Sequence, residues 1–338
     1  MKKITLQDMS KRLNISKSTI SIVLNGHGDE KRVSKDTQET IIKFAEENNY
    51  RANQLARGLS RGKSDMIGLV IPNISDSFYA RIARRIETKA RLSGYNVIFS
   101  STGESKERES ELIESMLDRQ VDGLIIASTQ QNEEDILRLK KSNFPFVLID
   151  RRYPDIETNF VGVDNVGGVA MAVEQLVKMG RKRIGFITLK PGLEAIHERL
   201  VGYQQTMKKF ELEVKDGFVH ELNYETFDEQ MPAVFEIMLN SSNDIDGIVF
   251  ATHFLTASGL REMKRRKVLV PNEVAIVSFG QMSAFDLVDP PITSIAQPVE
   301  DLGGRAVDIL LENLKDGITA YKQEMLDSSI EVRKSCGA

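Results

Sequence analysis

Apolar residues in the first fifty positions recur at helical spacing in three short stretches. In the first stretch, Thr5 followed by Asp8 resembles a capping box at the start of a helix. The apolar face that follows is formed by Leu6, Met9 and Leu13. We predict that this helix ends near residue 14.

The second stretch begins after Ser16, a residue type suited to cap a helix. It places Ile20, Val23 and Leu24 on a buried face, while the opposite face carries Lys17, Ser18, Ser21 and Ile22. A third helix is predicted from about Ser34, with Asp36 in its first turn, to about residue 49.

Two short helices joined by a tight turn and braced by a third form a helix-turn-helix. The polar face of the second helix is expected to enter the major groove of DNA. Small hydroxyls suit phosphate contacts, and the candidates for this role are Thr5, Ser16, Thr19 and Ser21. Any one of them could be only a helix cap, but four beside a basic surface favour a role at DNA.

From position 65 the pattern changes to short apolar runs separated by amphipathic helical stretches. The runs of strand length are 66–71, 96–99, 123–127, 146–149, 184–188, 247–251 and 274–279. This alternation predicts parallel sheets covered by helices on both faces. About 270 residues are long for one such sheet, so we expect two lobes.

Charge is distributed unevenly along a chain of ordinary globular composition, 41% hydrophobic and 28% charged. Residues 1–63 hold 13 Lys+Arg and 7 Asp+Glu, a net of +6, and the remainder carries −10, which gives the total of −4. A basic head on an acidic body suggests that the head meets a polyanion. The one cysteine, Cys336, excludes an intrachain disulfide, and no signal peptide or membrane span is apparent, so we expect a cytoplasmic protein.

Several motifs, in their order and spacing, resemble the lac-repressor (LacI/GalR) family of transcription regulators. They lie at 5–10, 16–25, 33–37, 50–59, 67–72, 121–126, 164–165, 180–187, 199–203 and 290–295. The resemblance implies an all-α helix-turn-helix head and an α/β core of two Rossmann-like lobes, similar to type-1 periplasmic binding proteins. It also implies a head over 1–50, a hinge helix and linker over 51–64, an N-terminal lobe over 65–163 with 294–322, and a C-terminal lobe over 164–291 with 323–338. Crossovers between the lobes are expected near 163, 290–294 and 321–324.

The resemblance assigns base reading to Lys17 and Ser18 at the start of the second helix. Ile22 stands where many relatives have an arginine, so it could contact at most an apolar group such as a thymine methyl. Arg32 lies in a loop that looks longer than in many relatives, and the sequence favours neither a phosphate contact nor a solvated loop there. The remaining implied DNA-binding residues are Thr5, Leu6, Ser16, Thr19, Ser21, Asn25, Ser34 and Thr37.

The segment 51–59 is implied to be a hinge that orders on DNA, with Asn53, Ala56 and Leu59 at the minor groove. Leu59 matches a leucine that wedges into a base step and kinks the duplex. Packing of Leu59 on the core is the alternative.

A small molecule is implied to bind between the lobes, where strands end. Asp150 and Arg199 match positions that grip the effector in relatives, although Arg199 could instead form a structural salt bridge. His253 fits a polar wall better than a metal ligand. The full set expected to contact the effector is Asn73, Ser75, Phe78, Ser128, Asp150, Arg199, Thr252, His253, Gly280, Gln281 and Gln297.

Two departures bear on the ligand. Sugar-binding relatives commonly have Asn-Asp where this chain has Thr252-His253, and acidic residues where it has Gly280-Gln281. Groups that accept from sugar hydroxyls are thus replaced, so we expect either a ligand other than a simply read monosaccharide or a weak response.

The sequence lacks the hydrolase, P-loop and zinc-protease motifs, so we expect no enzyme, cofactor or metal site. A solute-binding protein shares the two-lobed fold but would need export and would have no basic helix-turn-helix. We therefore predict a homodimeric repressor-type regulator. Its expected partners are a pseudo-palindromic DNA operator and a small effector, which could be a sugar, a sugar phosphate or another metabolite.

Overall fold

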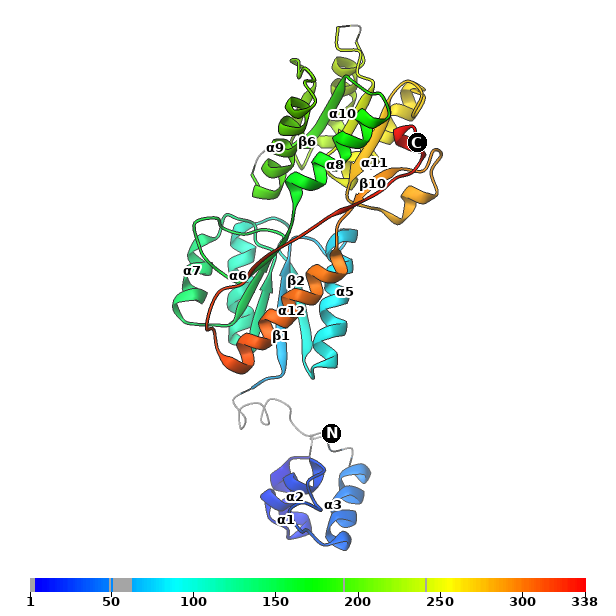
Figure 1. Ribbon diagram of the computed structural model, residues 1–338. Helices are drawn as coiled ribbons and strands as arrows, with labels where there is room; N and C mark the ends of the chain where they lie inside the picture. The colour runs from blue at the N-terminus through cyan, green and yellow to red at the C-terminus, as the bar shows by residue number, and fades with distance from the viewer. Residues whose placement is uncertain (1–3, 49, 51–62, 191, 241) are drawn as a thin grey trace. The chain divides into compact units, whose positions relative to one another are not determined.

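The computed structural model describes residues 4–48, 50, 63–190, 192–240 and 242–338. The chain divides between Ser64 and Asp65 into two compact units, a helical head and an α/β core (Figure 1). This confirms the predicted fold class of a helix-turn-helix head with a two-lobed core.

The head consists of α1 (Leu6–Leu13), α2 (Lys17–Leu24) and α3 (Lys35–Glu47). The predicted capping box is present: the Asp8 amide donates to the Thr5 hydroxyl at 3.2 Å, and the Thr5 amide donates to the Asp8 carboxylate at 3.0 Å. One small apolar cluster joins the three helices, and its buried members are Met9, Ile20, Val23, Ile41 and Ala45. This cluster fixes the angle at which α2 is presented.

The first lobe of the core is a six-stranded parallel sheet in the order β11-β5-β4-β3-β1-β2. Its strands are β1 (Met66–Ile71), β2 (Asn96–Ser101), β3 (Gly123–Ile126), β4 (Phe146–Ile149), β5 (Phe160–Val163) and β11 (Gln323–Leu326). One face is covered by α5 (Ser77–Leu92) and α12 (Val299–Asp316), the other by α6 (Lys106–Asp118) and α7 (Glu133–Lys141). Strands β1, β3 and β4 are buried almost throughout because helices cover both faces.

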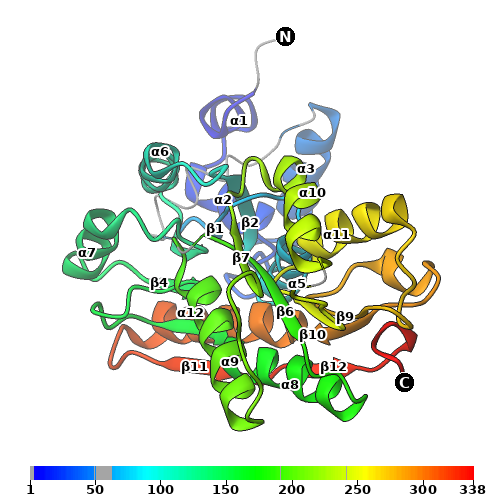
Figure 2. The ribbon, with the colours of Figure 1, turned by 90° about the horizontal axis from the view of Figure 1, so that it is seen from above.

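The second lobe is also a six-stranded sheet covered on both faces, in the order β12-β10-β9-β8-β6-β7, and it is parallel except that β12 runs antiparallel to β10. Its strands are β6 (Ile184–Leu189), β7 (Val219–Leu222), β8 (Gly247–Phe250), β9 (Ala275–Phe279), β10 (Thr293–Ala296) and β12 (Ser329–Glu331). In Figure 2, α8 (Asn165–Lys178) and α9 (Glu194–Lys209) lie side by side on one face, with α10 (Phe227–Met238) and α11 (His253–Arg266) on the other. Two short 3₁₀ helices, Ser283–Asp286 and Lys334–Cys336, complete the lobe.

Three chain segments pass between the lobes (Figure 1). The first crossover follows β5 at Val163, as expected. The other two differ from the expected boundaries. Residues 293–296 pair with β9 in the second sheet, so that crossover comes after Ala296 rather than at 290–294. Residues 323–326 pair with β5 in the first sheet, so the last crossover lies between Leu326 and Ser329 rather than at 321–324.

Candidate functional site

The exposed side of α2 presents a polar surface. Ile20 and Val23 are buried, while Lys17, Ser18 and Asn25 are exposed and Ser21 and Ile22 are half-buried. The Lys17 ammonium donates to the Gln7 side-chain oxygen of α1 at 2.7 Å. Sequence reasoning missed Gln7, although its place on the polar face of the first helix could have indicated it.

The hydroxyls of the head are engaged at helix starts. Ser16 accepts from the Thr19 amide at 3.1 Å, and Ser34 accepts from the Thr37 amide at 3.4 Å. Thr5 caps α1, and Leu6 is half-buried against the apolar cluster of the head. Capping uses one lone pair of each hydroxyl, so a phosphate contact stays a prediction for these residues.

The loop before α3 is held by hydrogen bonds. The Val33 amide donates to the Gly28 carbonyl at 2.9 Å, and the Lys35 ammonium donates to both Asp29 carboxylate oxygens at 2.7 and 2.8 Å. Arg32 is exposed at the end of this loop, with φ of 57°. The predicted hinge residues Asn53, Ala56 and Leu59 lie outside the described residues.

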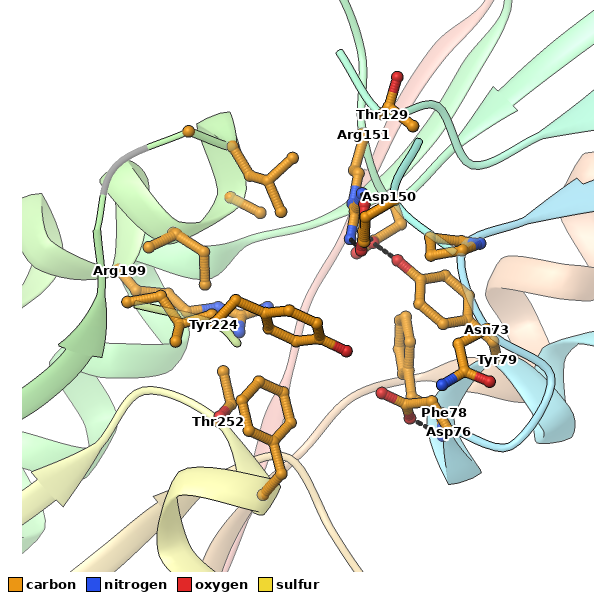
Figure 3. Close-up of a pocket in the computed structure, with 18 of the residues that line it drawn as sticks. Asn73, Asp76, Phe78, Tyr79, Thr129, Asp150, Arg151, Arg199, Tyr224 and Thr252 are labelled. Carbon is orange, nitrogen blue, oxygen red and sulfur yellow. Dashed lines mark hydrogen bonds and ion pairs between the residues drawn. The ribbon is translucent and has the colours of Figure 1, made fainter. Parts of the chain in front are cut away.

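A cavity of about 340 Å³ lies between the two lobes of the core, at the carboxyl ends of strands from both sheets (Figure 3). Seven of the residues expected to contact an effector line it: Asn73, Phe78, Asp150, Arg199, Thr252, His253 and Gln297. Asn73, Phe78 and Asp150 precede the first crossover in the chain, and the other four residues follow it. The cavity therefore forms only when both lobes are folded.

Four expected residues do not line the cavity. Ser75 is exposed on the loop before α5, where its amide donates to Asn73. Ser128 is fully buried behind the wall and donates to the Glu109 carboxylate at 2.9 Å. Gly280 has φ of 85° and no side chain to reach the cavity, and Gln281 is half-buried outside the lining.

Arg199 is the buried cation of the second lobe. Its Nε donates to the Asn165 side-chain oxygen and its Nη1 to the Ala251 carbonyl, both at 2.9 Å. The guanidinium lies 4.0 Å from the centre of the Phe279 ring. Burial lowers the pKa of Arg199 to about 10. Among the described residues no carboxylate oxygen comes within 4.0 Å of it, which contradicts the alternative of a structural salt bridge.

The first-lobe wall contains an ion pair that the sequence did not suggest. Arg151 donates from Nη1 and Nη2 to the two Glu104 carboxylate oxygens, each at 2.7 Å. The Asp150 carboxylate accepts from the Tyr79 hydroxyl at 2.7 Å, and burial raises the pKa of Tyr79 well above its usual value. Figure 3 shows Asp150, Arg151 and Tyr79 close together on this side of the cavity.

His253 faces Asp76 across the cavity, with 3.5 Å between Nε2 and Oδ1. Burial lowers the pKa of His253; Asp76 opposes that shift and Arg199 adds to it. Aromatic rings complete the lining, Phe78 from the first lobe and Tyr224 and Phe254 from the second. Tyr224 was missed because the strand before it, β7, was not predicted.

Within the described residues, no group of three or more His, Cys, Asp or Glu side chains is placed to hold a metal ion. None of the helices in the described part of the chain has the length and apolar character that crossing a bilayer requires.

Comparison with known proteins places these features in a family. Residues 5–53 match the model of bacterial regulatory proteins of the lacI family, and residues 173–336 match the periplasmic binding protein-like domain. Catabolite control protein A of Priestia megaterium is 31% identical over 334 residues, which cover 98% of this chain and 99% of that protein. The chain belongs to the lacI family of bacterial regulatory proteins.

Other members agree with this assignment. The catabolite repressor/activator of Escherichia coli strain K12 is 30% identical over 330 residues, covering 95% of this chain and 97% of that protein. The crystal structure of transcription regulator CcpA of Lactococcus lactis has a TM-score of 0.71 and 27% identity, over 80% of this chain and 98% of that one. The lac repressor dimer bound to operator matches the fold along the full length of both chains, with a TM-score of 0.85 and 21% identity. This LacI-type chain is therefore a transcriptional regulator with a DNA-binding helix-turn-helix and a core of the effector-binding type.

Proposed function

We propose that this LacI-type regulator binds a pseudo-palindromic operator as a homodimer in the cytoplasm and that a small molecule in the interlobe cavity changes its affinity for DNA. The observation that carries the proposal is the presence in one chain of an exposed recognition-helix surface at Lys17 and Ser18 and a cavity lined from both lobes. The name of one relative, the ribose operon repressor of Halalkalibacterium halodurans, favours repression as the outcome.

The head supplies the DNA contacts. Helix α2 begins at Lys17. The free backbone N–H groups of its first turn carry partial positive charge, and they lie at the same surface as the Lys17 ammonium. In the proposal Lys17 and Ser18 read base edges in the major groove, and the hydroxyls of Ser16 and Thr19 contact phosphate. The hinge residues Asn53, Ala56 and Leu59 then contact the minor groove, where Leu59 opens a base step.

The dimer follows from symmetry. One head covers one half-site, and two identical heads related by a two-fold axis read a two-fold repeated sequence. The solved lac repressor is a dimer on its operator, which supports the same assembly for a chain of the same fold.

The core supplies the response. A ligand that touches residues of both lobes, such as Asp150 and Arg199, stabilises one relative orientation of the lobes over others. If that orientation differs in its effect on the hinge, the ligand alters DNA affinity by about 1–3 kcal/mol, the usual range of such coupling. The effector class in this proposal is a sugar, a sugar phosphate or a related metabolite.

The test is a selection of duplexes from a random library by the full-length protein. The proposal predicts enrichment of an inverted repeat and a shift in base preference with Lys17→Ala or Ser18→Ala. Lys43→Ala is the matched control, because Lys43 is exposed in the same head but lies on α3. Enrichment of no sequence, or identical preferences in all variants, would reject the proposal.

A further inference from the structure

The second-lobe wall of the cavity contains a buried cation, Arg199, that has no carboxylate oxygen within 4.0 Å among the described residues. Arg199 is only 8% exposed and hydrogen bonds solely to neutral oxygens among the described residues. His253 lies in the same wall and is close enough for the Arg199 charge to lower its pKa. A buried guanidinium without a counter-ion is costly, and an anion brought by a ligand would offset that cost.

The carboxylates of the cavity are committed elsewhere. Glu104 is held by both Nη atoms of Arg151, and Asp150 by the Tyr79 hydroxyl. Asp76 caps α5 by accepting from the Phe78 amide at 2.8 Å. Glu225, at the rim, is exposed. Asp76 also lies 3.5 Å from Nε2 of His253. The carboxylates of the first-lobe wall are therefore engaged, whereas Arg199 in the second-lobe wall has no carboxylate oxygen within 4.0 Å among the described residues.

The ends of helices add to this field. Helix α11 begins at His253 and α9 begins at Glu194, and residues of both first turns line the cavity. Helix N-termini carry partial positive charge from their free N–H groups. Lys190 adds a further cation at the exposed rim, next to the start of α9.

Resting on the proposed effector function, we infer that the ligand is an anion: a small hydroxylated molecule whose carboxylate or phosphate group lies against Arg199 and His253 in the second lobe. Its hydroxyls lie toward Asp150 and Asn73 in the first lobe, where carboxylate and amide oxygens accept hydrogen bonds. The planar fork of Arg199 suits both kinds of anionic group. Because the anion and the hydroxyls contact opposite lobes, the ligand joins them.

The experiment measures the melting temperature of the full-length protein against matched probes. Glucose, galactose and mannose are each compared with their uronate and their 6-phosphate, and inorganic phosphate is tested against chloride at equal ionic strength. We expect the anionic member of at least one set to bind roughly tenfold or more tightly than its neutral sugar, as for one added charge-assisted contact. Comparing the uronate with the 6-phosphate of the same sugar shows whether the site prefers a carboxylate or a phosphate group.

Variants locate the effect. Arg199→Gln should abolish the preference for the anion, Arg199→Lys should retain part of it, and Lys264→Gln, an exposed cation on α11, should leave it unchanged. Operator binding by each variant shows that it is folded. The inference is overturned if inorganic phosphate and every anionic sugar fail to shift the wild type, if neutral sugars bind as tightly, or if the preference survives in Arg199→Gln. If one of these results is obtained while the protein still binds its operator, the anionic ligand is rejected but the proposed DNA-binding function is not.

The pH dependence of ligand affinity provides a second test. An anion beside His253 favours its protonated form, so affinity for the uronate should rise as pH falls toward the lowered pKa of His253. Asp76 and Arg199 are the charged groups that act on this imidazole. His253→Asn should remove the pH dependence; a dependence that persists in this variant would contradict the placement of the anion.

Discussion

The head should be stable only while its small core is intact, and Ile20→Ala tests this. Ile20 is fully buried where α2 packs on α1 and α3, so truncation leaves a cavity and costs about 2–5 kcal/mol. A core of this size supplies roughly 3–5 kcal/mol in total. A loss of about 3 kcal/mol lowers the folded population of the head about a hundredfold relative to the unfolded one.

The matched control is Ile42→Ala, because Ile42 lies on α3 of the same head and is 43% exposed. Its truncation should cost less than about 1 kcal/mol. Hydrogen exchange of head peptides, followed by mass spectrometry, should be fast in Ile20→Ala and slow in Ile42→Ala. DNA binding should fall in the same order, while the melting of the core stays unchanged because head and core are separate units. Slow exchange in both variants, or a core that melts with the head, would refute the reasoning.

Three further outcomes are expected. Glu104→Gln should lower the free energy of unfolding of the core by roughly 2–3 kcal/mol in a urea titration, because it leaves the buried charge of Arg151 without this partner; the loss is moderated because Glu104 is partly exposed. An unchanged urea midpoint would contradict this. Burial raises the pKa of Glu109. The free energy of unfolding of the wild type should therefore fall, relative to that of Glu109→Gln, as pH rises from the usual carboxyl range through the raised pKa. A rise in the relative stability of the wild type over this pH range would contradict the prediction. Leu59→Ala should weaken operator binding much more than binding to random duplex, and equal losses would exclude the wedge.

The sequence predicted the parts of the fold whose patterns are local. Buried strands such as 66–71 and 146–149 are continuous apolar runs, and the structure has them at those positions. The edge strands β7, β11 and β12 were missed because their residues are half exposed and polar, so they carry no such run. Strands β5 and β10 were also missed, although they are buried: each has only four residues, and Gly162 in β5 and Thr293 and Ser294 in β10 interrupt the apolar pattern. The last two crossovers were misplaced because only pairing across the sheet shows to which lobe the short strands β10 and β11 belong.

The cavity was predicted in part because strand ends converge in this fold. Asp150 and Thr252 directly follow strands and line the cavity as expected. Ser128 also follows a strand, but its side chain turns inward to Glu109, a contact 19 residues away in the sequence. The pairing of Arg151 with Glu104 joins residues 47 apart, which no spacing rule would have brought together.

The central claim, that the basic head of this regulator recognises a DNA sequence as a symmetric pair, is tested most directly by equilibrium binding of the full-length protein to its best selected duplex and to random duplex at one moderate salt concentration. We predict a preference of about a thousandfold or more for the selected inverted repeat, with two chains bound per duplex. Equal affinity for both duplexes, or binding of a single chain, would contradict the account.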